Sequence, residues 1–352
     1  MTHAAGTDEG SAHPALALTM GEPAGIGGEI ALAAWHAGRG GRDSVPPFFV
    51  IDDTARLEEL ANRIGLETPV TAIRTPDEAR GTFAKALPVL PIGLPAAVTP
   101  GRPDPANAGA VLEAIERAAA LAQNGEAAGI VTNPINKKVL YAEGFRHPGH
   151  TEYLGELAGV HEPPVMMLVC PGLRVVPVTV HLPLAQAIAA LSSAAIVHAG
   201  RVTAAALRRD FRIDRPRLAV AGLNPHAGEE STLGREETEI IAPAIETLRG
   251  DGIEVRGPAP ADSLFHAAAR ETYDAALCMY HDQALIPLKT IDFAHGVNVT
   301  LGLPFVRTSP DHGTALGIAG TGQANPASLI AALRTAGHIA EARAAAERRS
   351  VA

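Results

Sequence analysis

Short apolar runs alternate along the chain with longer segments in which apolar residues recur at helical spacing. The runs predict strands at residues 15–20, 48–52, 127–132, 165–170, 174–180, 217–223, 275–280 and 297–302. The longer segments predict helices through Trp35, over 53–64 and 106–123, from Leu184, and over 194–209, 236–249 and 326–349. Apolar, β-branched strands that alternate with such helices indicate an α/β fold with a mainly parallel sheet covered on both faces.

The length of the chain suggests more than one structural unit. At about 150 residues per domain, 352 residues make a little over two domains. We expect one α/β domain from residues 15–130 plus 290–352 and another from 131–289, so that the chain crosses between them twice. Residues 1–14 are expected to form a loose tail, and the proline-rich segments 94–105 and 257–260 to form loops.

Composition and charge exclude several classes of protein. The formal net charge is -9 and aromatic residues make up 4%, which argues against a nucleic-acid partner. The apolar region 165–197 is interrupted by Pro171, Arg174 and His181, so no clean span of about 20 residues predicts a membrane helix. Two distant cysteines and the lack of a secretory signal in the first residues favour the reducing cytoplasm.

Polar residues gather directly after the predicted strands. His181 follows 174–180, His226 follows 217–223, and His281 follows 275–280. One histidine at a strand end is usually structural, but the carboxyl ends of parallel strands meet at one sheet edge, where ligands bind. Three histidines there predict a catalytic site for a divalent metal, either zinc or another ion such as cobalt, manganese or magnesium.

A second group of polar residues could hold anions. Lys289, Asn298 and Arg307, with His150 and Thr151, could bind a phosphate and a carboxylate. Lys289 or Arg307 alone could equally form a surface ion pair. Asp262 could be a site carboxylate or the N-cap of a following helix. The glycine-rich loop at 21–28 lacks the GxGxxG fingerprint and by itself indicates a tight turn before a helix.

Taken in order, these motifs resemble one family over nearly the whole chain. The segments are LTMGEPAGIG (18–27), TNPINKKVL (132–140), PGHTEYL (148–154), VHLPL (180–184), NPHAGE (224–229), GPAPADSLF (257–265), MYHDQALIPLK (279–289) and GVNVTLGLPFVRTSPDHGTALGIAGTG (296–322). Together they resemble the 4-hydroxythreonine-4-phosphate dehydrogenases of pyridoxine biosynthesis.

The resemblance implies a fold of the isocitrate/isopropylmalate dehydrogenase type, with two α/β domains and a cleft between them. It implies NAD or NADP as cofactor, contacted by Gly25, Asp311, His312, Gly313 and Thr314. His181, His226 and His281 match the family's metal ligands, and His150, Thr151, Lys289, Asn298 and Arg307 its substrate contacts. It also implies a homodimer with the active site at the subunit interface, for which we expect the second subunit to supply His281.

The implied reaction is the oxidation and decarboxylation of 4-phosphooxy-L-threonine. Asp262 and Lys137 are both candidates for the base that takes the hydroxyl proton. One alternative is a related dehydrogenase of a phosphorylated four-carbon sugar acid, 4-phosphoerythronate or 4-phosphothreonate. A three-histidine hydrolase or lyase would explain the histidines but not the segment 311–322. A phosphate acetyltransferase of related fold would have no need of the histidines.

Overall fold

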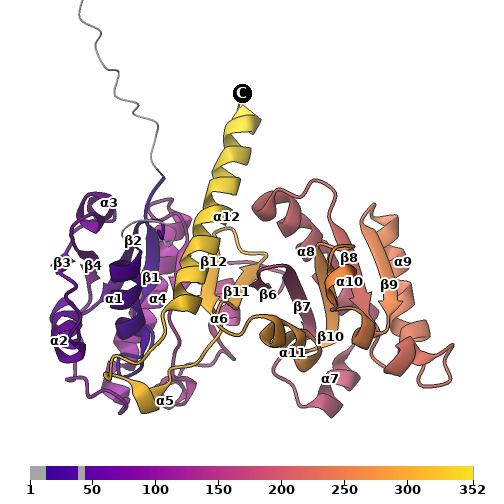
Figure 1. Ribbon diagram of the computed structural model, residues 1–352, viewed down its shortest axis with the longest axis horizontal. Helices are drawn as coiled ribbons and strands as arrows, with labels where there is room; N and C mark the ends of the chain where they lie inside the picture. Colours follow the sequence, from indigo (N-terminus) through magenta and orange to yellow (C-terminus); the bar gives the residue numbers. More distant parts are fainter. Residues whose placement is uncertain (1–12, 39–43, 352) are drawn as a thin grey trace, which may run out of the picture.

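The computed structural model describes residues 13–38 and 44–351, and within them one continuous sheet of twelve strands (Figure 1). Most of the expected tail, residues 1–12, therefore lies outside the described residues. The strands are β1 (Leu16–Thr19), β2 (Phe48–Asp52), β3 (Val70–Ala72), β4 (Leu87–Pro91), β5 (Ile130–Thr132), β6 (Val165–Cys170), β7 (Leu173–Thr179), β8 (Arg217–Ala221), β9 (Glu254–Ala259), β10 (Ala275–Tyr280), β11 (Val297–Leu301) and β12 (Arg307–Pro310).

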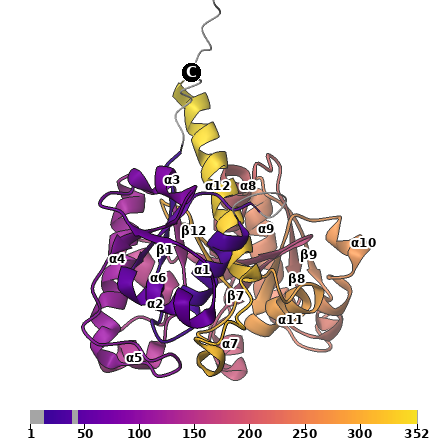
Figure 2. The same ribbon diagram turned by 60° about the vertical axis from the view of Figure 1, so that its left-hand side comes forward.

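Helices cover the sheet on both faces (Figures 1 and 2). The α-helices are α1 (Gly27–Ala37), α2 (Thr54–Ile64), α3 (Glu78–Phe83), α4 (Ala108–Gln123), α5 (Lys137–Ala142), α6 (His150–Leu157), α7 (Leu184–Ala190), α8 (Ser193–Phe211), α9 (Ala242–Gly250), α10 (Ala267–Arg270), α11 (His281–Ile291) and α12 (Ala327–Val351). Short 3-10 turns include η3 (Pro225–Gly228) and η5 (Ala261–Ser263). The predicted α/β class is confirmed.

The sheet consists of two parallel blocks joined by antiparallel strands. Its order is β3-β4-β2-β1-β5-β12-β11-β6-β7-β10-β8-β9. The first six strands pair in parallel, as do β7, β10, β8 and β9. Strand β11 pairs antiparallel with both β12 and β6, and β6 pairs antiparallel with β7. The strands of the two expected domains are therefore hydrogen-bonded into one sheet.

Several short elements escape the hydrophobic pattern. Segment 257–260, expected as a loop, lies largely in the edge strand β9, whose Gly257–Pro258 bond is cis. An edge strand tolerates proline because it pairs on one side alone. The strands β3, β4 and β12 were also not predicted. Strand β3 is mostly exposed, so it lacks the apolar run from which a strand is recognised.

Helix α12 connects the two parallel blocks of the sheet. Yellow in Figure 1, it packs against β12 of the first block, against β11, and against α8, which itself packs on β7, β10 and β8 of the second block. There the Arg343 guanidinium binds the buried Asp210 carboxylate, with N···O distances of 2.8 and 3.0 Å. Helices α5 and α6 belong to the hydrophobic core of the first block, which includes β1, β2 and β5. There Leu140 and Tyr153 pack with Val111 of α4. The domain boundary expected near residue 130 stays a prediction.

No single described helix is long and apolar enough to span a membrane. Helices α7 and α8 reach the required length and composition together, but they meet at an angle of 88°.

Candidate functional site

The largest set of predicted site residues lines one cavity at the carboxyl ends of β5, β7 and β10, between the two halves of the sheet. The cavity encloses about 400 Å³. Its walls include Lys137, His150, Thr151, His181, His281, Lys289, Asn298, Arg307, Asp311, His312 and Gly313. These residues come from segments far apart in the sequence. The block with β5 and β12 and the block with β7 and β10 run in opposite directions, because three antiparallel pairings through β11 and β6 separate them. The residues therefore meet where the two blocks adjoin and not at one common edge of the sheet.

Arg307 is a buried cation at the bottom of this cavity. It begins β12, it is 3% exposed, and its Nη1 and Nη2 donate to the hydroxyls of Thr300 and Thr132 at 2.8 and 2.7 Å. Its Nε has no hydrogen-bond partner within the described chain. Burial lowers the pKa of Arg307 to about 10, so the guanidinium is still protonated at neutral pH. A buried cation held by hydroxyls is well placed to receive an anionic ligand.

Further polar atoms in the cavity wall are buried without a partner in the described residues. They are Asn133 Oδ1, His150 Nε2, Asn298 Oδ1 and His312 Nε2. Burial, and then the positive charges of Arg307 and Lys137, hold the pKa of His150 well below its usual value. His150 is therefore a neutral ring at pH 7. Because buried polar groups in proteins are normally satisfied, these four atoms and Arg307 Nε around one cavity indicate a polar ligand.

The two lysines enter the cavity from opposite halves. Lys137 is the first residue of α5, which Asn136 caps through an Oδ1 contact with the Val139 amide at 3.4 Å. Lys289 lies on α11 and pairs with Asp311 at 3.1 Å. Asp311 belongs to the segment implied to hold the cofactor, so this ion pair joins the expected substrate and cofactor sides of the site.

Two of the three predicted metal ligands meet here. His181 follows β7 with a positive φ of 52°, and His281 begins α11 directly after β10. Their ring centroids are 5.8 Å apart. His281 Nδ1 lies 2.7 Å from the Asp282 carboxylate, which leaves Nε2 for another partner. Burial, with Lys137 and His281 nearby, lowers the pKa of His181 and favours the neutral form that binds metals.

His226 and Asp262 lie outside this cavity. His226 is exposed on turn η3, and Asp262 is exposed on η5, which packs against η3. The described residues contain no group of three His, Cys, Asp or Glu side chains placed to hold a metal ion. The expectation that His281 is the ligand from a second subunit is not supported, because His281 already adjoins His181 within one chain. The histidine that stands apart is His226.

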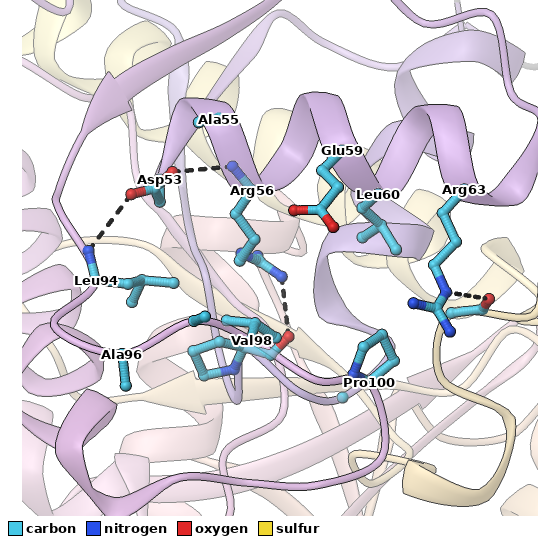
Figure 3. A pocket seen from close by; sticks show the side chains of 14 residues that line it. Asp53, Ala55, Arg56, Glu59, Leu60, Arg63, Leu94, Ala96, Val98 and Pro100 are labelled. Carbon is cyan, nitrogen blue, oxygen red and sulfur yellow. Dashed lines mark hydrogen bonds between the residues drawn. The ribbon is translucent and has the colours of Figure 1, made fainter.

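A second cavity of about 280 Å³ lies beside α2 (Figure 3). Asp53, Glu59 and Arg63 line one side, and the segment from Leu94 to Pro100 lines the other. Asp53 caps α2 by accepting from the Arg56 amide at 2.9 Å. The Arg56 guanidinium, paired with Asp52, donates to Pro23 O at 2.9 Å.

Gly25 connects the second cavity with the predicted cofactor segment. Gly25 lines the second cavity, while Asp311, His312 and Gly313 line the first. The amide of Ile26 donates to Thr314 O at 3.1 Å, and a Cβ at Gly25 would lie 2.9 Å from the same oxygen. Only glycine allows this close approach. The segment 311–314 therefore runs between the two cavities.

Together the fold and the cavity define an α/β enzyme whose site accepts a polar, anionic ligand. The chain belongs to the family of pyridoxal phosphate biosynthetic protein PdxA, whose family model matches residues 44–336. The resemblance noted from the motifs is confirmed.

Relatives named 4-hydroxythreonine-4-phosphate dehydrogenase are similar along almost their whole length. The protein of Bradyrhizobium diazoefficiens is 53% identical over 339 residues, covering 93% of this chain and 97% of the relative. That of Methylorubrum populi is 55% identical over 332 residues, covering 93% and 94%. The crystal structure of the Klebsiella pneumoniae enzyme is 38% identical and superposes with a TM-score of 0.83, covering 93% of this chain and 99% of that one.

Sequence reasoning missed two parts of the site. Glu152 lines the first cavity, and its position in PGHTEYL, beside His150 and Thr151, was the available signal. The second cavity was not foreseen, because Asp53 and Glu59 read as ordinary polar positions of an amphipathic helix.

Proposed function

We propose that this protein oxidises and decarboxylates 4-phosphooxy-L-threonine with a nicotinamide cofactor, giving 3-amino-2-oxopropyl phosphate for pyridoxal 5'-phosphate biosynthesis. The observation that carries the proposal is the first cavity, where a buried arginine and unpartnered polar atoms gather in a protein of net charge -9. Family membership and the names of the relatives supply the identity of the substrate.

The cationic side chains match the two anionic groups of this substrate. Arg307 can offer its free Nε–H, and Lys289 can offer its ammonium group, to the phosphate and the carboxylate. His150, held neutral, and Thr151 can add hydrogen bonds without further charge. Asn298 can orient a hydroxyl through its unpartnered Oδ1.

His181 and His281 are the residues that would hold a divalent metal within one chain, and their imidazole nitrogens suit zinc, cobalt, manganese or magnesium. A metal held there would supply Lewis-acid chemistry at the substrate hydroxyl, and a nicotinamide cofactor would supply the hydride acceptor. Oxidation gives 2-amino-3-oxo-4-phosphooxybutanoate, a β-keto acid that loses CO2. Lys137, which lines the cavity, is the base candidate within this chain, because Asp262 lies outside it.

A homodimer would complete the site. A second copy would bring its exposed His226, and the neighbouring Asp262, to the His181–His281 pair. Large exposed apolar side chains lie on or next to α7 and α11, the helices that follow this pair: Leu182, Leu184, Ile188, Ile286 and Phe293. Such residues favour an interface there, whose symmetry would form two equivalent sites.

For the cofactor, the two cavities suggest opposite ends of one binding site. The nicotinamide would lie in the first cavity beside His312 and Gly313, and the adenosine in the second, with segment 311–314 between them. Asp53 and Glu59 could accept hydrogen bonds from ribose hydroxyls. NAD and NADP both remain candidates. Both cysteines are free and buried, which suits a cytoplasmic enzyme.

The test is an assay of the purified protein with 4-phosphooxy-L-threonine and either NAD+ or NADP+. We expect reduced nicotinamide and CO2 in equal amounts, and loss of activity with a chelator that is reversed by a divalent metal. Oxidation of 4-phosphoerythronate or 4-phosphothreonate alone would favour the alternative, a sugar-acid dehydrogenase. No nicotinamide reduction with any of these compounds would overturn the proposal.

A further inference from the structure

Glu152 is a carboxylate without a protein partner in a cavity otherwise dominated by cations. It is the third residue of α6, it is half-buried, and it lines the first cavity. No hydrogen bond or ion pair involves its side chain among the residues that the structure describes. Partial burial of an unpaired carboxylate costs free energy. A ligand that donates a hydrogen bond or brings a positive charge to Glu152 would offset this cost.

The surroundings of Glu152 place it among the groups that would hold the substrate. Glu152 Oε2 and Lys137 Nζ each lie 3.6 Å from the point where a Cβ at Gly149 would stand. Its negative charge also acts on Arg307 and His181, where it opposes the lowering of the pKa by burial. Glu152 therefore faces the substrate and metal sides of the cavity together.

The other described carboxylate that lines the cavity is already engaged. Asp311 pairs with Lys289 at 3.1 Å. Asp282, just outside, lies 2.7 Å from Nδ1 of His281. Glu152 is thus the carboxylate in the cavity wall that is free to accept a proton donor from a ligand.

We propose that Glu152 binds the ammonium group of the amino-acid substrate and thereby selects it over 2-hydroxy acids of the same shape. This inference rests on the proposed function. The phosphate and the carboxylate of 4-phosphooxy-L-threonine call for the cationic side chains, whereas its ammonium group calls for an anion. A sugar acid carries a neutral hydroxyl at that carbon, so it would lose a charge-assisted hydrogen bond and leave Glu152 desolvated.

The experiment compares kcat/KM for two substrates in three proteins. The substrates are 4-phosphooxy-L-threonine and its 2-hydroxy analogue, a 4-phosphothreonate of the same configuration. For Glu152→Gln we expect kcat/KM with the amino acid to fall about ten- to a hundredfold, the range of a lost charged hydrogen bond. The value for the hydroxy acid should stay level or rise. Glu152→Asp should restore part of the preference for the amino acid.

Glu156→Gln is the matched control. Glu156 lies one turn further along α6, its side chain is 71% exposed, and its contact is with His147 at 3.5 Å. This variant should keep the wild-type ratio of the two kcat/KM values. Thermal unfolding of each variant checks the fold, and if Glu152→Gln does not fold, the ratio measured for Glu152→Asp decides.

The outcomes separate the possible roles of Glu152. Equal losses for both substrates would indicate a base or a purely structural carboxylate and would overturn the inference. Unchanged kcat/KM values for both substrates in Glu152→Gln would overturn it as well, while leaving the proposed function intact. A wild-type protein that oxidises the hydroxy acid but not the amino acid would refute both.

Discussion

At the scale of single residues, the cavity holds groups whose state depends on burial. Arg307 keeps its charge although it is 3% exposed, because two threonine hydroxyls receive its Nη protons and its pKa of about 10 is far above neutral. Burial, and then the charges of Arg307 and Lys137, also lower the pKa of His150, but its ordinary value is near neutral, so the ring loses its proton. Because the His150 ring is neutral, it does not repel an anion, and the charge of the Arg307 guanidinium is available to an anionic group of the ligand.

His150 predicts a pH dependence of stability. Its pKa in the folded state lies below the ordinary 6.5, so the unfolded chain takes up the proton first as pH falls. We therefore expect the thermal midpoint of the ligand-free protein, in chelator, to fall between about pH 7.5 and 5.5. His150→Asn should show a smaller fall, whereas the exposed His161→Asn should match wild type. An identical pH dependence in the two variants would contradict the assignment.

At the scale of elements, the cofactor side is built from two loops that glycine allows to touch. Gly21 has a φ of 68°, and a Cβ there would lie 2.6 Å from Pro134 O. Glycine alone fits such a position. The same loop, which follows β1, places Gly25 against the Thr314 carbonyl. In the loop after β4, the amide of Gly101 donates to Ala24 O at 2.7 Å. The loops after β1 and β4 thereby form a common wall with segment 311–320.

This arrangement predicts that filling the second cavity impairs the cofactor alone. Ala97 is exposed and lines that cavity. Ala97→Trp should raise KM for NAD+ or NADP+ about tenfold or more, because the indole would occupy the space proposed for adenosine. KM for 4-phosphooxy-L-threonine should not change. Ala120→Trp on the exposed side of α4 is the control, and an equal KM for the dinucleotide in both variants would count against adenosine in this cavity.

At the scale of the whole molecule, one sheet places two of the three predicted metal ligands together and the third apart. Strands β7, β10 and β8 are neighbours, so their following histidines reach the same edge. His226 nevertheless stands on an exposed turn, with positive φ at both His226 and Ala227. The turn is anchored at its base by Asn224, whose amide donates to Glu236 and Glu237 at 2.7 and 2.9 Å. The turn therefore holds His226 in a defined conformation on the surface.

Mixed dimers test which histidine crosses the interface. His181→Ala and His226→Ala should each be inactive alone. If His226 comes from the second copy, co-expression of the two should restore about a quarter of wild-type activity, since half of the dimers then contain one intact site. His181→Ala mixed with His281→Ala should stay inactive. Recovery in this second mixture would show that His281, not His226, is the shared ligand.

The sequence by itself determined the α/β class, the family and most of the polar groups that meet in the first cavity. It could do so because the alternation of apolar runs and helices is a local property, and because parallel strands deliver the residues that follow them to one edge. His181 and His281 could thus be assigned to a common site from their positions after predicted strands, whereas Arg307, Lys289 and His150 could be assigned to it as the family's substrate contacts.

Only the tertiary structure decided which of these groups lie together. That β11 and β6 would join the two parallel blocks, and that His281 would adjoin His181 while His226 stood apart, depends on long-range strand pairing and on backbone turns with positive φ. The role of Glu152 likewise rests on which charges surround it and which carboxylates are already paired. Hydrophobic periodicity does not predict such contacts, because it depends on neighbouring residues, whereas the contacts form between residues that are distant in the chain.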